Sequence, residues 1–318
     1  MLATTRHGPF PLSEPFAIPG FTRARFPVVR MADFVLHADP TSKQLPSEAD
    51  FRGTVESLNR SFPLLMHSFT LKYGESGKSG RHGFQPMLVS WMAHAHRVGV
   101  SKHVLFVGKR DVDCEAARVF APCIVDTPSL GYPAPVHEWA QNLRWIYTNL
   151  LLRSGFDHVS TDADAFLMQN PFPVLARGKD VAGLTDRLGD GTGGLGYCEE
   201  PDSPCQSTGF TFFRATPAVR EVVQTFVNTL NGGFEQGLWN PYAIKLVRMG
   251  VYDRLPNAGP EAFSNWNALL PSVTQKQETR PVVVHMGGEQ GGANGFWMDV
   301  KEHIFRCAQL WLDESFMS

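Results

Sequence analysis

The chain has 318 residues, of which 43% are hydrophobic and 19% charged, which suits one large α/β domain or two smaller ones. Its net charge is −2, with 29 basic against 31 acidic residues, so no basic excess indicates a nucleic-acid partner. The sequence contains no run of about 18 apolar residues, so no membrane span is predicted. The first residues lack the apolar core of a signal peptide. The chain as given is expected to be cytoplasmic, with the Golgi lumen as the alternative if its N-terminus is incomplete.

The five cysteines predict no clear disulfide framework. Cys198 and Cys205 bracket a short loop that a disulfide would close in an oxidising compartment, and free buried thiols are an equal alternative. The spacing of the cysteines does not resemble a zinc site.

Residues 1–60 are rich in proline, phenylalanine and charge, which predicts an irregular N-terminal arm packed on a main domain at 61–318. Strand and helix patterns then alternate, which predicts an α/β fold with a mostly parallel central sheet flanked by helices. His94 and His96 are expected on the surface of one helix. Strands are predicted at 62–70, 103–107, 123–126, 156–161, 180–184, 207–214 and 281–285, and helices at about 86–98, 113–120, 136–153, 217–230 and 238–249.

An acidic pair follows the apolar strand at 156–161. Asp162 and Asp164 stand one residue apart, and such side chains point to the same face of an extended chain. Two adjacent carboxylates repel unless a cation or donors compensate, and oxygen ligands suit Mg²⁺ or Mn²⁺ with positions open for phosphate. Ligands of parallel α/β sheets bind beyond the carboxyl ends of the strands. The pair therefore predicts a metal and diphosphate site, with a ligand-free acidic turn as the alternative.

Several further segments follow one another in an order that resembles the nucleotide-diphospho-sugar transferase family, which includes plant and algal arabinosyl- and xylosyltransferases. The resemblance spans about residues 60–305, with Ser207 and Glu235 departing from the asparagine and aspartate of the family pattern. The segments are Arg144, Leu152-Arg153-Ser154-Gly155, Thr161-Asp162-Ala163-Asp164, Asn170-Pro171-Phe172-Pro173, Ser207-Thr208-Gly209-Phe210, Glu235-Gln236, Leu255-Pro256, Phe263-x-Asn265, Val284-His285 and Lys301.

The resemblance implies a glycosyltransferase-A fold and a metal-dependent glycosyltransferase that uses a nucleoside-diphosphate sugar, with retention. It implies that Asp162 often reaches the ribose while Asp164 binds the metal, expected to be Mn²⁺ or Mg²⁺. His285, at the end of a buried strand, is the other candidate ligand, and a core histidine is its alternative role. The acceptor is expected to be a hydroxyl of a glycan, a glycoprotein or a small molecule.

Two groups of polar residues are expected to surround the donor. Arg144 and Lys301 are expected to neutralise the diphosphate, and Ser68 and Thr70, at the end of the first strand, to contact the nucleotide. Solvated surface positions are the alternative for the two basic residues.

The candidates for catalysis are Asp186, Glu235 and Gln236. A carboxylate base opposite the leaving group gives inversion. Retention lets the departing phosphate take the proton, with Gln236 near the reacting face, and spacing in the sequence does not decide between the two. The alternative is that Asp186 or Glu235 only caps a helix.

Two other functions fit the acidic pair. A metal-dependent nucleotidyl or phosphoryl transferase would usually carry a glycine-rich phosphate loop as well. A non-catalytic binding module of the same fold is the other alternative, which the departures at Ser207 and Glu235 keep open.

Overall fold

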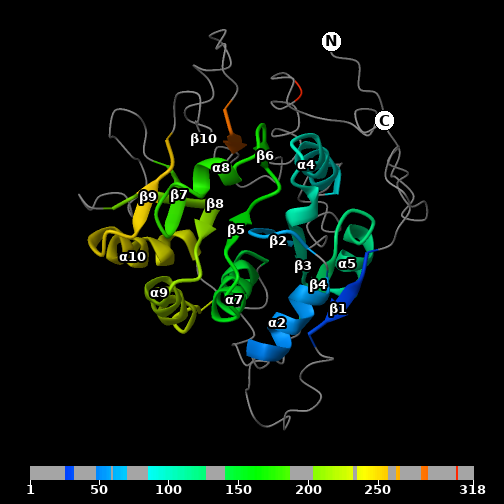
Figure 1. Ribbon diagram of the computed structural model, residues 1–318, viewed down its shortest axis with the longest axis horizontal. Helices are drawn as coiled ribbons and strands as arrows, with labels where there is room; N and C mark the ends of the chain where they lie inside the picture. The colour runs from blue at the N-terminus through cyan, green and yellow to red at the C-terminus, as the bar shows by residue number, and fades with distance from the viewer. Residues whose placement is uncertain are drawn as a thin grey trace, which may run out of the picture.

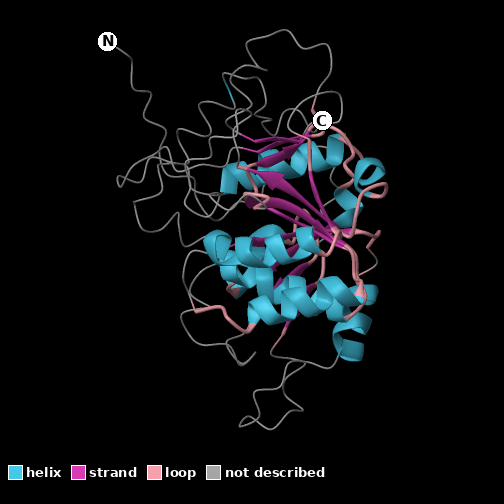
Figure 2. Cartoon of the chain, turned by 90° about the vertical axis from the view of Figure 1, so that its left-hand side faces the viewer, coloured by secondary structure: helices cyan, strands magenta, loops and turns pink. Residues whose placement is uncertain are grey.

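The computed structural model describes residues 26–31, 48–58, 60–69, 85–126, 140–186, 203–231, 235–256, 263–265, 281–285 and 306. Within these ranges a large sheet lies between two layers of helices, and a three-stranded sheet lies beside it (Figure 1, Figure 2). The strands of the large sheet are β1 (Val28–Arg30), β2 (Leu64–Phe69), β3 (Val104–Gly108), β4 (Cys123–Val125), β5 (His158–Thr161), β7 (Val181–Thr185), β8 (Gln206–Phe213) and β9 (Tyr252–Arg254).

The small sheet consists of β6 (Ala165–Leu167), β10 (Phe263–Asn265) and β11 (Val283–His285). The helices are α2 (Glu48–Ser57), α4 (Gln85–Arg97), α5 (Asp111–Ala117), α7 (Ala140–Arg153), α8 (Phe172–Leu175), α9 (Pro217–Val227) and α10 (Glu235–Arg248), with a 3₁₀ turn η1 (Ser101–His103). None of the helices within the described ranges is long and apolar enough to cross a membrane.

The strand order in the large sheet is β1-β4-β3-β2-β5-β8-β7-β9. Every neighbouring pair is parallel except those of β8, which runs antiparallel to both β5 and β7. The predicted mixed α/β architecture with a mostly parallel sheet is therefore confirmed. Because β8 runs the other way and Phe210 pairs with Thr161, the residues that precede Phe210 extend past the carboxyl end of β5.

Apolar side chains fill both faces of the large sheet. On one face, α2, α7, α9 and α10 enclose an aromatic cluster in which Trp145 lies 4.7 Å from Phe226 and 4.4 Å from Trp239, measured between ring centroids. On the other face, Trp91 of α4 packs on Phe106 of β3, and α5 and β6 join the same core. Figure 2 shows these two helical layers with the strands between them. This packing holds the strand ends in a fixed arrangement.

The N-terminal arm contributes regular structure where it is described. β1 pairs in parallel with β4 at the sheet edge, and α2 packs on α7. Phe51 and Val55 of α2 and Leu58 directly after it are spaced by three or four residues and are buried, so one helical face is apolar. This short pattern was too brief to predict a helix from the sequence.

A disulfide between Cys114 and Cys123 joins α5 to the start of β4, with 5.3 Å between the Cα atoms. The sequence predicted no such pair, because the packing of α5 against β3 and β4 is what brings the two side chains together. Cys205 is also disulfide-bonded. Cys198, which the sequence suggested as a disulfide partner of Cys205, lies outside the described residues.

One prediction for α4 is wrong. His94 is fully buried and stacks on Phe166 of β6 with 4.8 Å between ring centroids, whereas His96 is exposed as expected. The small sheet covers the side of α4 that the sequence indicated as surface.

Candidate functional site

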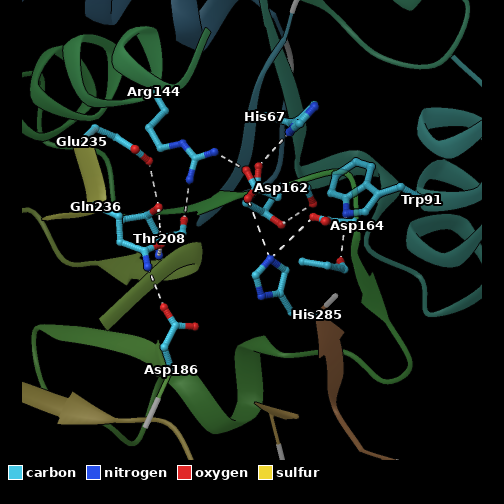
Figure 3. A network of polar contacts seen from close by, with 12 residues as sticks. His67, Trp91, Arg144, Asp162, Asp164, Asp186, Thr208, Glu235, Gln236 and His285 are labelled. Carbon is cyan, nitrogen blue, oxygen red and sulfur yellow. Dashed lines mark hydrogen bonds and ion pairs between the residues drawn. The ribbon is translucent and has the colours of Figure 1, made fainter. Parts of the chain in front are cut away.

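Two carboxylates and an imidazole meet where the large and small sheets join (Figure 3). Asp162 follows β5, Asp164 precedes β6, and antiparallel pairing of β6 with β11 sets His285 opposite Ala165. The Nε2 atom of His285 lies 3.5 Å from Asp164 Oδ1 and 3.8 Å from Asp162 Oδ2. One ligand atom from each of the three residues falls within 4.8 Å of the others. The structure thus brings together all three residues predicted from the sequence to bind metal.

A glycine of β8 makes room for the histidine ring. A Cβ atom at Gly209 would lie 2.1 Å from His285 Nε2 and 2.3 Å from Cε1, far inside van der Waals contact. The same residue is tied to the acidic turn, because Asp162 N donates to Gly209 O at 2.8 Å. Only a residue without a side chain lets His285 reach the two carboxylates.

The electrostatics of the cluster favour positive charge. Burial alone would lower the pKa of His285, but Asp164 and Asp162 raise it to about 9. Burial would raise the pKa of Asp162, but Arg144 together with His285 lowers it. Two carboxylate oxygens and one imidazole nitrogen at this spacing form a donor set that suits Mn²⁺ and, with its hard oxygen ligands, Mg²⁺. The residues present therefore fit a divalent cation.

Arg144 of α7 connects this cluster to the next part of the site. Its side chain is buried, forms an ion pair with Asp162 Oδ1, and donates from Nη1 to the backbone oxygen of Thr208 at 2.6 Å. Burial would lower the pKa of Arg144, but the charge of Asp162 raises it. One oxygen of Asp162 thus faces Arg144 and the other faces His285, and Asp164 Oδ1 also lies next to His285.

The three residues predicted for catalysis form a second group around Thr208. The hydroxyl of Thr208 donates to Glu235 Oε1 at 2.9 Å, and its backbone N donates to Gln236 Oε1 at 3.1 Å. Gln236 Nε2 then donates to Asp186 Oδ2 at 2.5 Å. Figure 3 shows Glu235 and Gln236 on one side of Thr208, with Asp186 beyond Gln236 and the Asp162 cluster on the other side. Glu235 is the first residue of α10, one turn earlier than the helix start predicted from the sequence.

Two residues that sequence reasoning missed support the acidic turn through its backbone. His67 Nδ1 donates to Thr161 O at 2.7 Å, and Trp91 Nε1 donates to Ala165 O at 3.1 Å, so the turn is held at both ends. Burial lowers the pKa of His67, which keeps the ring neutral with the proton on Nδ1. Hydrogen bonds from side chains to backbone carbonyls have no sequence motif. The sequence therefore predicted only that these two residues lie among apolar neighbours.

The remaining predicted residues are Ser68, Thr70 and Lys301. Ser68 is buried near the carboxyl end of β2, the strand beside β5. Thr70 and Lys301, predicted to contact the nucleotide and the diphosphate, lie outside the described residues.

Comparison with known proteins finds similar sequences among sugar transferases. Residues 141–295 match the family described as nucleotide-diphospho-sugar transferase, a range that contains the acidic turn, β8, α10 and His285. This region of the chain is therefore similar to the nucleotide-diphospho-sugar transferase family. Among individual proteins, the chain is similar to "Arabinosyltransferase RRA1" of Arabidopsis thaliana, with 26% identity over 167 residues that cover 42% of this chain and 39% of that protein.

Solved structures of glycosyltransferases are similar at low identity. The apo structure of the bifunctional glycosyltransferase WbbM has a TM-score of 0.45 and 12% identity, covering 71% of this chain and 46% of that chain. The galactosyltransferase LgtC, solved with donor and acceptor sugar analogues, has a TM-score of 0.43 and 11% identity, covering 78% of this chain and 96% of that one. The chain spans less than half the length of RRA1 and WbbM.

Proposed function

We propose that this chain is a metal-dependent glycosyltransferase that moves a sugar from a nucleoside-diphosphate sugar to a hydroxyl acceptor, with retention. The observation that carries the proposal is the cluster of Asp162, Asp164 and His285, whose ligand atoms fall within 4.8 Å of one another at the carboxyl end of β5. The family match of residues 141–295 supports the same reaction class. The acceptor belongs to a glycan, a glycoprotein or a small molecule.

The chemistry centres on the charge of the departing nucleoside diphosphate. A bound Mn²⁺ or Mg²⁺ supplies Lewis-acid stabilisation of the phosphate oxygens. Asp164 and His285 would hold the ion, and Asp162 would share the oxygen that faces His285. Arg144 provides a buried positive charge beside Asp162, and this charge helps to neutralise the negative charge of the leaving group. Lys301 is proposed to add a second cation, and Ser68 and Thr70 to contact the nucleotide.

The proposed retention rests on the surroundings of the two carboxylates. Glu235 is only 5% exposed and accepts the hydroxyl of Thr208, so it is poorly disposed to take a proton from an incoming hydroxyl. Asp186 is occupied on Oδ2 by the amide of Gln236. The departing phosphate is then the base that takes the acceptor proton, which a retaining mechanism allows. The anomeric configuration of the first product, followed by NMR, tests this step, and an inverted product contradicts it.

The test of the proposed function combines binding with turnover. Nucleoside diphosphates are expected to raise the melting temperature only when Mn²⁺ is present, and a panel of sugar nucleotides should reveal one that is hydrolysed or transferred. Asp164→Ala is expected to abolish turnover while the fold is kept, and Asp111→Ala, which removes an exposed surface carboxylate, serves as the control. Full activity of Asp164→Ala, or equal activity in chelator, overturns the proposal.

The same assays separate the other functions considered. Phosphoryl or nucleotidyl turnover from a nucleoside triphosphate would identify a nucleotidyl or phosphoryl transferase. No response to either nucleotide would identify a binding module of the same fold.

Domain organisation and compartment complete the proposal. We assign residues 61–318 to the transferase domain and 1–60 to an arm packed on it. The Cys114–Cys123 disulfide favours an oxidising lumen such as that of the Golgi over the cytoplasm, because cytosolic thiols are kept reduced. Free-thiol counting on protein isolated without reductant checks this assignment, since reactive Cys114 and Cys123 would contradict it.

A further inference from the structure

An irregularity in β8 opens the backbone of Thr208. On β7, Gly183 pairs with Thr211 of β8 and the next residue, Leu184, pairs with Ser207. Three residues of β8, Thr208 to Phe210, therefore have no partner on β7. A bulge of this kind re-aims side chains and leaves backbone groups to find other partners.

The backbone groups of Thr208 are taken by functional side chains. Its oxygen accepts from Arg144 at 2.6 Å, and its nitrogen donates to Gln236 Oε1 at 3.1 Å. Its hydroxyl lies 2.9 Å from Glu235 Oε1 and 3.2 Å from Gln236 Oε1. A hydroxyl has one proton, and the nearer, charged carboxylate is the stronger acceptor, so the proton goes to Glu235.

These contacts leave one orientation for the carboxamide of Gln236. The backbone N–H of Thr208 requires an oxygen at one end, and the carboxylate of Asp186, 2.5 Å from Nε2, requires a donor at the other. Both the oxygen and the nitrogen of the Gln236 carboxamide are therefore hydrogen-bonded to protein groups. Asp186 is partly exposed, at the end of β7.

We propose that Thr208 is a positioning residue which, through Glu235 and Gln236, sets the orientation of Asp186, and that Asp186 is the group of this set that contacts a sugar hydroxyl. The inference rests on the proposed function and divides the roles among its candidates. Gln236 and Glu235 then act by holding other groups, whereas the carboxylate of Asp186 accepts a hydrogen bond from the substrate. A displacement of about 1 Å in such a group costs about a hundredfold in rate.

The first experiment compares Thr208→Val with Thr208→Ser. Valine keeps the shape and the backbone N–H but removes the hydroxyl that anchors Glu235, the neighbour of Gln236 at the start of α10, and serine restores it. We expect kcat to fall about tenfold or more in Thr208→Val, with Mn²⁺-dependent binding of nucleoside diphosphate unchanged, and Thr208→Ser to recover most of the loss. Comparing donor hydrolysis with transfer separates the two sources of the hydroxyl: both rates fall if Asp186 contacts the donor sugar, and transfer alone falls if it contacts the acceptor.

A second variant keeps the test sharp if Thr208→Val folds poorly. Gln236→Glu still accepts from Thr208 N but sets a carboxylate oxygen against Asp186, and two such carboxylates share a proton, which raises one of their pKa values. Among the described residues, Asp186 interacts electrostatically with Tyr252, which also interacts with Arg254 and Asp253, and Glu235 interacts with Arg144. We expect Gln236→Glu to lose about tenfold or more in kcat at neutral pH and to regain activity as the pH falls.

The outcomes separate the two levels of the argument. Thr208→Val with wild-type kcat, or Gln236→Glu with the wild-type pH profile, overturns the positioning role and leaves the proposed function standing. A wild-type chain that turns over no sugar nucleotide overturns the proposed function and this inference with it.

Discussion

Gly209→Ala tests whether His285 has to reach the two carboxylates. The new Cβ atom would lie 2.1 Å from His285 Nε2, and ordinary contact begins at 3.4 Å, so the ring has to retreat by about 1.3 Å (3.4 minus 2.1). The backbone of His285 cannot easily follow, because β11 is paired with β10 on one side and β6 on the other. Gly209 is not among the residues with positive φ, so the effect comes from the ring contact and not from backbone strain.

The expected magnitude follows from this displacement. A ligand moved by more than 1 Å leaves the coordination sphere, so Mn²⁺ should bind at least about 10 to 100-fold more weakly. The crowded site should also lower the free energy of unfolding by about 1–3 kcal/mol. Titration calorimetry with Mn²⁺ and thermal unfolding measure the two effects separately.

Two comparisons control the experiment. Gly53→Ala in α2 meets nothing within 4 Å and should stabilise the helix by about 0.5–1 kcal/mol without changing Mn²⁺ binding. In a His285→Ala background the ring is gone, so Gly209→Ala should weaken Mn²⁺ binding no further. Wild-type Mn²⁺ affinity in Gly209→Ala, or the same loss in both backgrounds, would refute the reasoning.

Three further predictions concern stability. Arg144→Met removes a buried cation from Asp162 and should lower the free energy of unfolding by about 3–5 kcal/mol in urea, with a clearly smaller loss for Arg144→Lys; equal losses would contradict the charge argument. Replacing Cys114 and Cys123 by serine should cost about 2–4 kcal/mol and make the melting temperature less sensitive to reductant. Burial lowers the pKa of His158 from 6.5 to about 4, so its contribution is complete above pH 6.5 and is lost as the pH falls toward 4, by about 3 kcal/mol; His158→Phe should show a shallower decline between these pH values.

Much of the large sheet could be predicted because its strands appear in the sequence as runs of apolar residues. The strand that ends at Asp162 and the strand around Phe210 were both predicted, and their positions follow from burial on both faces. The register between them was not readable. It is this register, with Phe210 opposite Thr161, that carries Thr208 and Gly209 past the end of β5.

The parts of the site that escaped prediction depend on contacts between distant segments. Thr208 is an ordinary strand residue in sequence, and its proposed role depends on the bulge that breaks its pairing with β7. His94 looked exposed because its cover, the small sheet, is assembled from segments that follow it by about 70 to 190 residues, from Ala165 to His285. Short elements such as β1 and β9, three residues each, are too brief to show a period.

The position of the cluster ties metal binding to the assembly of the two sheets. Asp162 follows a strand of the large sheet, Asp164 precedes a strand of the small one, and His285, on the central strand of the small sheet, lies against Gly209. A cation bound by all three residues would therefore be stabilised only when both sheets are in place. By linkage, the same cation would stabilise the junction against local opening by an amount that grows with its concentration relative to its Kd. The two carboxylates repel one another without a positive partner. Arg144 pairs with Asp162 and His285 pairs with Asp164, so these positive side chains also help to hold the two sheets together.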